Sequence, residues 1–232
     1  MNIVVTGSKG FIGKNLIERL EKMNKYNIYS IDIHNLDLTS REEVMNSEYF
    51  KLADYIICCH ALNPKVQKDF LSSTSPFDDC NLIIDYLKVN TISLNFIIES
   101  TLSRYKKNNN SKIPSLIYLS SIYSKRSPKH FLYKDTSKTP WYGASKAASD
   151  YLIKYFAAKY FGKLNLNSII LGGVKKGDEN LEFIKEYSKN SPSNSMLSIN
   201  EVLEYIESLI NNPLPPASSG SEIILDGGWL LW

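Results

Sequence analysis

A tyrosine and a lysine stand four positions apart in the segment Tyr142-Gly143-Ala144-Ser145-Lys146. On a helix this spacing places a phenol and an ammonium one above the other on the same face. A free tyrosine, with a pKa of about 10, is a poor base at neutral pH, but a neighbouring ammonium favours the phenolate and lowers that pKa. Tyr142 and Lys146 are therefore a candidate acid/base pair, although the same spacing also occurs by chance on an ordinary helix face.

Two further polar residues precede this pair. Ser121 follows the apolar run Ser115–Ser120, and a buried strand there would turn its terminal hydroxyls toward the crevice at the carboxyl edge of a sheet. Asn90 lies inside a long helical pattern, where by itself it indicates no more than a tolerated polar residue.

A glycine-rich turn, Thr6–Gly13, joins an apolar run to an amphipathic helical pattern. Such a turn lets a pyrophosphate approach the backbone, and the free N–H groups of the helix start can bind it. A purely structural turn is the alternative, whereas a Walker A loop is excluded because Asn15 replaces the required Ser or Thr. The residues predicted to contact a dinucleotide here are Gly7, Lys9, Gly10, Phe11, Ile12 and Gly13.

Asp32 stands near the end of the second apolar run, Ile28–Ile33. A carboxylate at this point accepts hydrogen bonds from a ribose 2′-OH and repels a 2′-phosphate, which favours NAD over NADP. The alternative is a solvated carboxylate at a strand end, and use of NADP stays open.

Apolar runs alternate with helical patterns along the whole chain, which predicts an α/β fold with a doubly wound, seven-stranded parallel sheet flanked by helices. No shift in composition marks a second domain, so residues 1–232 are expected to form a single domain. The predicted strands are Asn2–Val5, Ile28–Ile33, Leu36–Leu38, Tyr55–Cys58, Ser115–Ser120, Asn165–Leu171 and Glu222–Leu225. The predicted helices are Ile12–Met23, a short helix with a capping box of Ser40 and Glu43, Leu82–Tyr105, Trp141–Phe161, and one from Ser198 to Asn212.

Composition narrows the classes of function. The chain has 232 residues, 43% of them hydrophobic, and a net charge of +3, which is too mild to argue for nucleic acid as a partner. No run approaches the roughly 18 apolar residues of a membrane span, and the three cysteines have no zinc-site spacing. We therefore expect a cytoplasmic protein with reduced thiols, no metal, no membrane contact and a small-molecule substrate.

Taken together, these motifs resemble the short-chain dehydrogenase/reductase family, in the family's order and along nearly the whole chain. The matching segments are Thr6–Gly13, Asp32, Asp37-Leu38-Thr39, Asn90, Ser120-Ser121, Tyr142–Lys146 and Asp226-Gly227-Gly228-Trp229. The resemblance implies a Rossmann-type, NAD(P)-dependent oxidoreductase that interconverts an alcohol and a ketone.

The resemblance also implies roles for individual residues. Tyr142 would be the general acid/base, Lys146 would hold the nicotinamide ribose, and Ser121 would orient the substrate carbonyl. Asn90 would anchor a water in the proton relay. Other predicted cofactor contacts are Asp37 and Leu38 by the adenine, His60 and Ala61 at an altered strand end, and Gly172 and Val174 after the sixth predicted strand.

A narrower similarity links the chain to bacterial members associated with surface-polysaccharide or flagellar-glycan sugars. It rests on the long insert between Ser121 and Tyr142 and on three segments: Ala61-Leu62-Asn63-Pro64-Lys65, Ser120-Ser121-Ile122-Tyr123 with Pro128 and Tyr133, and the ending Asp226-Gly227-Gly228-Trp229. That insert carries Lys125, Arg126, Lys129 and His130 next to the predicted active site. A solvated basic loop is the default interpretation, and binding of a sugar phosphate or nucleotide diphosphate is the alternative. Substrate-binding loops are predicted at about 124–139 and 172–198.

Two other functions fit the same motifs. One is a nucleotide-sugar epimerase or dehydratase whose bound NAD is reduced and reoxidised within one cycle. The other is a non-catalytic dinucleotide sensor, which commonly lacks the tyrosine or the lysine. The aromatic side chains Tyr151, Tyr155 and Tyr160 further predict pairing of this helix in a homodimer or homotetramer.

Overall fold

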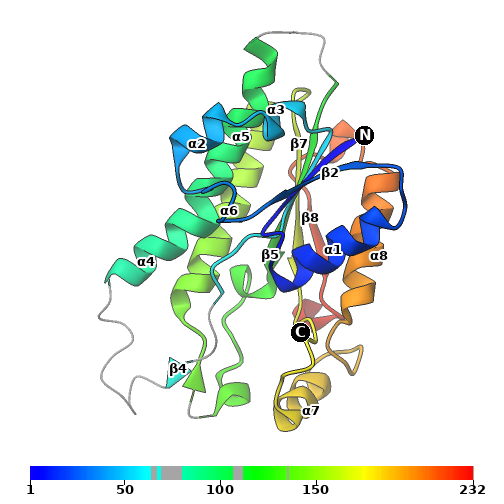
Figure 1. Cartoon of the computed structure of the whole chain (residues 1–232). Helices are drawn as coiled ribbons and strands as arrows, with labels where there is room; N and C mark the ends of the chain where they lie inside the picture. The colour runs from blue at the N-terminus through cyan, green and yellow to red at the C-terminus, as the bar shows by residue number, and fades with distance from the viewer. Residues whose placement is uncertain (64–66, 69–79, 107–111, 135, 232) are drawn as a thin grey trace.

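In the computed structural model, which describes residues 1–63, 67–68, 80–106, 112–134 and 136–231, a parallel sheet runs through the centre of the molecule (Figure 1). Its six strands lie in the order β2-β1-β3-β5-β7-β8, and every neighbouring pair is parallel. The strands are β1 (Asn2–Thr6), β2 (Asn27–Ile31), β3 (Tyr55–Cys58), β5 (Ser115–Ser121), β7 (Asn165–Leu171) and β8 (Glu222–Leu225). The predicted doubly wound α/β fold is confirmed, with its switch point between β1 and β3.

The predicted strand Leu36–Leu38 is wrong, so the sheet has six strands rather than seven. The chain turns directly after β2: Asn35 and Leu36 donate backbone hydrogen bonds to Asp32 O, and Asn35 Nδ2 donates to Ser30 O. A parallel crossover needs a dozen or more residues, and this link is too short for one. Leu36 and Leu38 are instead buried in the core as parts of a turn.

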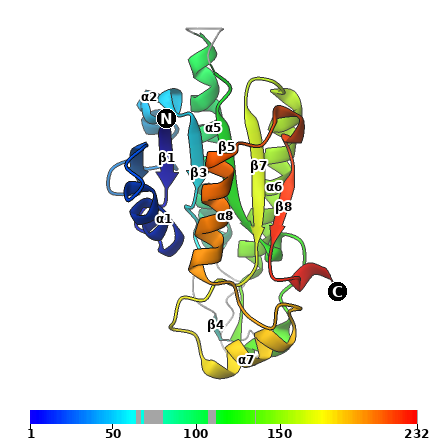
Figure 2. The ribbon, with the colours of Figure 1, turned by 90° about the vertical axis from the view of Figure 1, so that its right-hand side faces the viewer.

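Helices cover both faces of the sheet (Figures 1 and 2). On one face, α1 (Phe11–Glu21) and α8 (Ile199–Asn211) pack together over a cluster that includes Leu16, Leu20 and Ile206. On the other face lie α2 (Arg41–Asn46), α3 (Tyr49–Leu52), α4 (Cys80–Leu87), α5 (Ser93–Ser103) and α6 (Pro140–Lys159), over a second cluster. These two clusters stabilise the sheet from its two faces, since β1, β3, β5 and β7 each contribute side chains to both.

Two local predictions need correction. The helix predicted over Leu82–Tyr105 is interrupted by a π-helical turn, Lys88–Ile92, and ends in a 3₁₀ turn, Arg104–Lys106. At the start of α2, Ser40 accepts a hydrogen bond from Glu43 N, but Glu43 turns its carboxylate to Asp37 N instead of completing a capping box. The complete capping box lies at the start of α8, between Ser198 and Glu201.

Several further segments lie beyond the carboxyl ends of the strands, toward the bottom of Figures 1 and 2. They include α7 (Leu181–Lys189), the antiparallel pair β4 (Gln67–Lys68) and β6 (Thr136–Ser137), and short 3₁₀ turns at Ile122–Ser124, His130–Tyr133 and Trp229–Leu231; a further 3₁₀ turn, Pro216–Ser218, precedes β8. A third cluster, of Ile122, Leu132, Tyr133, Ile170, Tyr187 and Trp229, packs these segments against the sheet edge. Within the described part of the chain, no helix is both long and apolar enough to cross a bilayer.

Candidate active site

Close backbone packing explains two glycines of the turn between β1 and α1. Gly7 has φ +64°, and a Cβ there would lie 2.6 Å from His60 N. A Cβ on Gly13 would lie 2.3 Å from Gly7 O. Only glycine therefore lets the turn fold against the end of β3 and lets α1 start close above it.

Gly10 serves the start of α1 differently. It is the N-cap residue, has an ordinary extended backbone conformation, and offers no side chain to cap the first turn of the helix. The first N–H groups of a helix have no acceptor within the helix, and their dipoles favour an anion. Because Gly10, Phe11 and Ile12 also line a large cavity, this uncapped turn fits the diphosphate of a dinucleotide.

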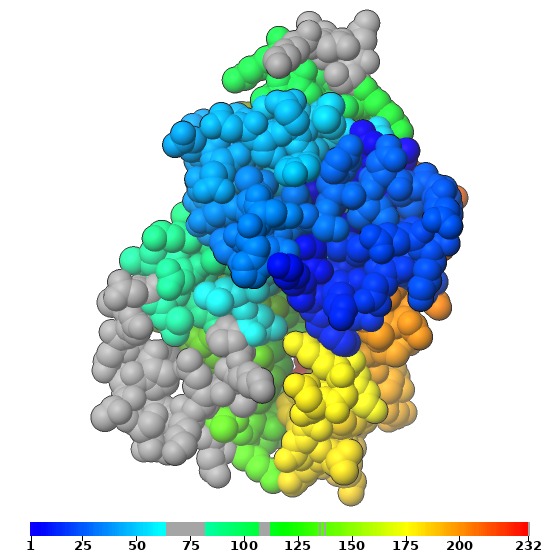
Figure 3. Space-filling view, in the orientation of Figure 1, coloured from blue at the N-terminus to red at the C-terminus, as the bar shows by residue number. Residues whose placement is uncertain are grey.

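That cavity, of about 760 Å³, lies at the carboxyl ends of the strands. Its mouth lies between the blue start of α1, the yellow segment after β7 and the green insert before α6 (Figure 3). Three groups of residues line it. They are Gly10–Ile12 with Cys59, Ala61 and Asn63; Leu119–Tyr123 with Tyr142 and Lys146; and parts of 132–138 and 171–196.

Ser121 and Tyr142 meet at this cavity, as the sequence predicts. Ser121 is the last residue of β5, and Tyr142 lies in the first turns of α6, which begins at Pro140 after the N-cap Thr139. Burial raises the pKa of Tyr142 to about 12, and a hydrogen bond from Ser121 opposes that rise. Without a further positive charge, Tyr142 thus holds its proton at neutral pH.

Lys146 lies one turn further along α6, with only 2% of its surface exposed. Its ammonium donates a hydrogen bond of 2.7 Å to Leu119 O and sits 4.4 Å from the centre of the Tyr118 ring. Burial lowers the pKa of Lys146 to about 8, while the carboxylate of Asp150 raises it. The side chain is therefore a fixed, buried cation beside Tyr142.

Asn90 lies next to these residues but not in the lining of the cavity. It sits, fully buried, in the π-helical turn, where its side chain bonds Leu62 N (2.7 Å) and Ser145 Oγ (2.9 Å). Its backbone carbonyl accepts from Tyr118 and Ser149. Asn90 thus joins the chain after β3 to α6, and its part in a proton relay stays a prediction.

Asp32 directly follows β2 and lies apart from the large cavity. Its carboxylate accepts from Ser8 Oγ (3.2 Å) and His34 N (2.8 Å) and lies 3.5 Å from Lys9 Nζ. The backbone hydrogen bond from His34 contributes most to lowering its pKa, and Ser8 and Lys9 add to this effect. An ionised group beside the glycine turn suits a ribose hydroxyl, so the geometry is compatible with the predicted role.

The adenine-side prediction involves Asp37 and Leu38. Asp37 accepts hydrogen bonds from the backbone and hydroxyl of Thr39 (both 2.8 Å), and Leu38 is buried in the core. Their contact with the adenine stays a prediction.

His60 points its side chain away from the cavity. Its ring nitrogens bond Thr6 Oγ1 (2.6 Å) and Ser93 Oγ (2.8 Å), and burial lowers its pKa to about 3. Only its backbone, which packs against Gly7, and the neighbouring Ala61 are placed to approach a cofactor.

Gly172 and Val174 lie on the opposite wall of the cavity. A Cβ on Gly172 would lie 2.8 Å from Asp226 Cα, so the chain passes very close to the end of β8 there. The segment is further held by a bridge between Val174 and Leu197 and by a hydrogen bond from Gly173 N to Tyr187 Oη (2.7 Å).

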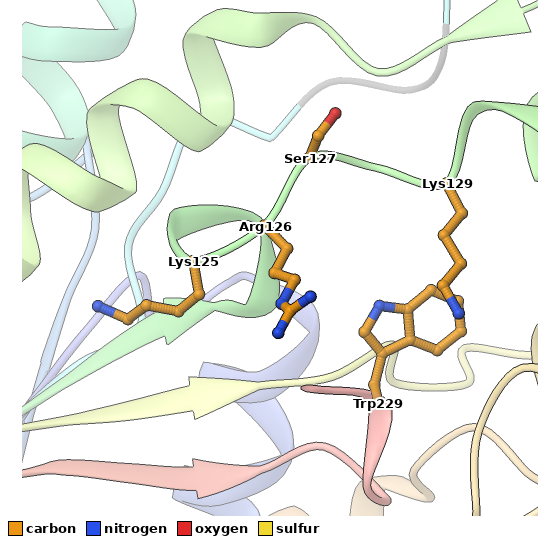
Figure 4. Close-up of a pocket in the computed structure, with 5 residues that line it drawn as sticks. All are labelled: Lys125, Arg126, Ser127, Lys129 and Trp229. Carbon is orange, nitrogen blue, oxygen red and sulfur yellow. The ribbon is translucent and has the colours of Figure 1, made fainter. Parts of the chain in front are cut away.

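Part of the insert lines the large cavity, but its basic residues Lys125, Arg126 and Lys129 do not. Lys125, Arg126 and Lys129 surround a separate cavity of about 520 Å³, together with Ser127 and Trp229 (Figure 4). Trp229 stacks on Tyr187, with ring centres 4.2 Å apart, and Tyr187 lines the catalytic cavity. This aromatic pair therefore stands between the two cavities.

Other cations line the catalytic cavity, and the sequence analysis did not single them out. Lys138 donates to Asn63 Oδ1 (3.2 Å), and Lys176 lies over the Phe11 ring. Lys134 pairs with Glu182 at 2.6 Å and so links the insert to α7. The sequence predicts 124–139 and 172–198 as substrate-binding loops. It does not predict which of their side chains face the cavity, because that depends on contacts between residues far apart in the chain. Pro64 and Lys65 of the narrower similarity lie outside the described residues.

Fold and site together define a dinucleotide-binding protein of the short-chain dehydrogenase type. The sequence model of the NAD dependent epimerase/dehydratase family matches residues 3–174. The chain belongs to this family, which confirms the predicted class and the prediction of NAD as cofactor.

Curated relatives match only a short stretch. The ADP-L-glycero-D-manno-heptose-6-epimerase of Pseudomonas aeruginosa is 39% identical over 56 residues. Those residues make up 24% of this chain and 16% of the epimerase, so the chain spans only a small part of that relative's length.

Solved structures are similar over nearly the whole chain. A short chain dehydrogenase from Leptospira borgpetersenii with bound NAD⁺ has a TM-score of 0.80 at 19% identity, covering 98% of this chain and 92% of its own. A 4-hydroxyisoleucine dehydrogenase complexed with NADH has a TM-score of 0.79 at 17% identity, covering 100% and 99%. The aldohexose dehydrogenase of Thermoplasma acidophilum has a TM-score of 0.75 at 18% identity, covering 100% and 94%. At these identities the likeness establishes the fold.

Proposed function

We propose that the protein is an NAD-dependent oxidoreductase that interconverts an alcohol and a ketone on a sugar or sugar-derived substrate. The observation that carries the proposal is the meeting of Ser121, Tyr142 and Lys146 at one cavity, opposite the uncapped start of α1. The cofactor, when bound, accepts or donates the hydride.

Each of the three side chains has a distinct task in this proposal. Tyr142 takes the proton of the substrate hydroxyl during oxidation and returns it during reduction. Burial raises the pKa of Tyr142. The ammonium of Lys146, one turn along the same helix, and the positive charge of an oxidised nicotinamide would both favour the phenolate against this effect. Ser121 shares a hydrogen bond with Tyr142 and would orient the substrate oxygen between them.

A carbohydrate substrate has two lines of support. The curated relative acts on a nucleotide-linked heptose and one structural neighbour is an aldohexose dehydrogenase, as their names state. The cavity also carries hydroxyl and amino groups suited to a polyhydroxylated or phosphorylated molecule, from Tyr123, Tyr133, Lys138 and Lys176. We therefore propose that segments 124–139 and 172–198 bind the substrate.

The family name and the curated epimerase favour one second candidate, an epimerase or dehydratase that retains NAD through its cycle. Stoichiometric release of NADH with product supports the oxidoreductase. Product formed without net NADH supports the epimerase or dehydratase instead.

The test is a substrate screen with NAD and NADP that spans free sugars, sugar phosphates and nucleotide sugars. On the best substrate, Tyr142→Phe is expected to lower kcat by at least about 100-fold while NADH still binds. Tyr49→Phe is the matched control, because Tyr49 lies exposed on α3, outside the cavity and away from the α6 surface proposed below for association. Full turnover by Tyr142→Phe would remove the proposed general acid/base.

We also propose a homodimer or homotetramer. The helix α6 and the residues just after it expose Tyr151, Tyr155 and Phe161, and the neighbouring α4 and π-helical turn expose Ile84 and Ile92. Apolar side chains gathered in this way favour association. Light scattering at micromolar concentration tests the proposal, and a monomer would contradict it.

A further inference from the structure

A buried carboxylate, Asp150, lies on α6 one turn beyond Lys146, with 2% of its surface exposed. Three donors surround its Oδ2: Ser120 Oγ at 2.9 Å, Ser124 Oγ at 2.6 Å and Lys125 Nζ at 2.9 Å. Its other oxygen, Oδ1, is buried without a hydrogen bond to any described residue. Burying a charged group costs free energy unless the charge is compensated, so a carboxylate at this buried position calls for an explanation beyond packing.

The first consequence concerns Ser121. Ser120 precedes it, and Ser124 Oγ also lies 2.8 Å from Ser121 O. Through Ser120 and Ser124, the Asp150 carboxylate ties the turn that carries Ser121 to the helix that carries Tyr142. Lys125 extends away from Arg126 and Trp229 (Figure 4). Its ammonium forms ion pairs with both Asp150 and Glu222 and so links α6 to β8 as well.

The second consequence concerns the charge of Lys146. Several titratable groups surround Lys146. They are Tyr142 on its own helix, Tyr118 on β5, and Cys58, Cys59 and His60 at the end of β3. Burial keeps all of these groups neutral at pH 7, because it raises the pKa of the phenols and thiols and lowers the pKa of His60. Among the described residues that act on Lys146, Asp150 alone supplies negative charge at that pH.

We propose that Asp150 is a positioning residue: its carboxylate keeps the buried Lys146 protonated and holds the Ser121 turn against α6. The part that concerns Ser121 rests on the proposed function. The part that concerns Lys146 is a property of the protein without substrate or cofactor, so the two can fail separately.

Carbon-13 NMR of the lysine Cε atoms in the cofactor-free protein tests the charge directly, with the Lys146 signal assigned from Lys146→Met. The wild-type midpoint is expected near pH 8. In Asp150→Asn, which keeps the shape and an acceptor oxygen, the midpoint should fall by at least about one pH unit. Asp150→Glu should restore it. An unchanged midpoint in Asp150→Asn overturns the proposal.

Two variants separate this effect from structural damage. Asp226→Asn removes another buried aspartate, which bonds Gly228 N and Leu230 N, and should leave the Lys146 midpoint in place. Lys125→Met removes a cation from Asp150 and should raise the midpoint. A lowered midpoint in Lys125→Met overturns the proposal even if Asp150→Asn does not fold.

Turnover provides the second measurement. In Asp150→Asn, the alkaline limb of the kcat profile should move to lower pH, and kcat should fall by about tenfold with little change in the affinity for NADH. A fall in kcat without any move of the limb indicates only structural damage and contradicts the role of Asp150. If the wild-type protein turns over no substrate, the proposed function fails, whereas the NMR result still decides the charge of Lys146.

Discussion

Two glycines of the β1–α1 turn are expected to respond differently to the same substitution. A Cβ on Gly13 would lie 2.3 Å from Gly7 O, whereas a Cβ on Gly10 would meet the same oxygen at 3.1 Å. The first distance is about 1 Å short of an ordinary contact, and a backbone oxygen cannot rotate away. Gly13→Ala must therefore move α1, while Gly10→Ala needs only a small adjustment.

The magnitudes follow from these distances. Overpacking costs about 1–3 kcal/mol, and a clash with a backbone atom belongs in the upper half of that range. Because alanine recovers up to about 1 kcal/mol of helix propensity, Gly13→Ala should lose about 1–2 kcal/mol of stability. For a chain of this size the loss corresponds to a Tm lower by roughly 2–8 °C. Gly10 has φ −72° and ψ 165°, which alanine adopts without strain, so Gly10→Ala should change Tm by less than about 2 °C.

For NADH affinity we expect the opposite order, with the larger effect in Gly10→Ala. A methyl group at Gly10 enters the cavity beside the uncapped helix start, where the diphosphate is expected, and should weaken NADH binding by about tenfold or more. Thermal unfolding and fluorescence titration with NADH measure both quantities on the same samples. Wild-type affinity in Gly10→Ala would refute binding of the diphosphate at this turn, and a wild-type Tm in Gly13→Ala would refute the crowding.

Three further predictions concern charge. Asp32→Ala should raise the affinity for NADPH relative to NADH by about tenfold, because Lys9 then faces a 2′-phosphate without the opposing carboxylate; an unchanged ratio in titrations would contradict this. His60 has a folded pKa of about 3, so below pH 6.5 the unfolded state takes a proton that the folded state refuses. Stability should fall by about 2 kcal/mol between pH 7 and 5 in urea melts, and His60→Gln, if it folds, should flatten that dependence. Lys146→Met removes a buried cation whose pKa is lowered to about 8, so it should raise the free energy of unfolding by up to about 3 kcal/mol while abolishing turnover. Lys125→Met, which breaks contacts to Asp150 and Glu222, should instead lower the free energy of unfolding. A loss of stability in Lys146→Met as large as that in Lys125→Met would contradict the destabilising burial of the Lys146 cation.

Local signals explain what the sequence could predict. The glycine turn, the Tyr142–Lys146 spacing and the apolar runs all act over a few residues, and the strands Asn165–Leu171 and Glu222–Leu225 have the predicted bounds. Leu36–Leu38 resembled a strand because two buried leucines alternate with a polar residue. The decisive contact, from Asn35 to Ser30 O, is invisible in such a pattern.

Side-chain direction in the insert could not be predicted for the same reason. Lys125 is drawn to Asp150 and Glu222, which lie 25 and 97 positions away in the chain and come together only across α6 and β8. Lys134, Lys138 and Lys176, which do line the cavity, come from segments with no periodic pattern. Asp150 itself looks like an ordinary polar helix residue until β5 is packed against it.

The third hydrophobic cluster has a consequence for how this protein can diversify. It contains Leu132, Tyr133, Tyr187 and Trp229 and is separate from the two clusters that hold the sheet. Leu132, Tyr133 and Tyr187 line the large cavity, so substitutions at these three positions should reshape one of its walls while the packing of the other two clusters stays intact. New substrate preferences can therefore accumulate in a lineage without passing through unfolded intermediates, and libraries confined to this cluster should retain a high fraction of folded members.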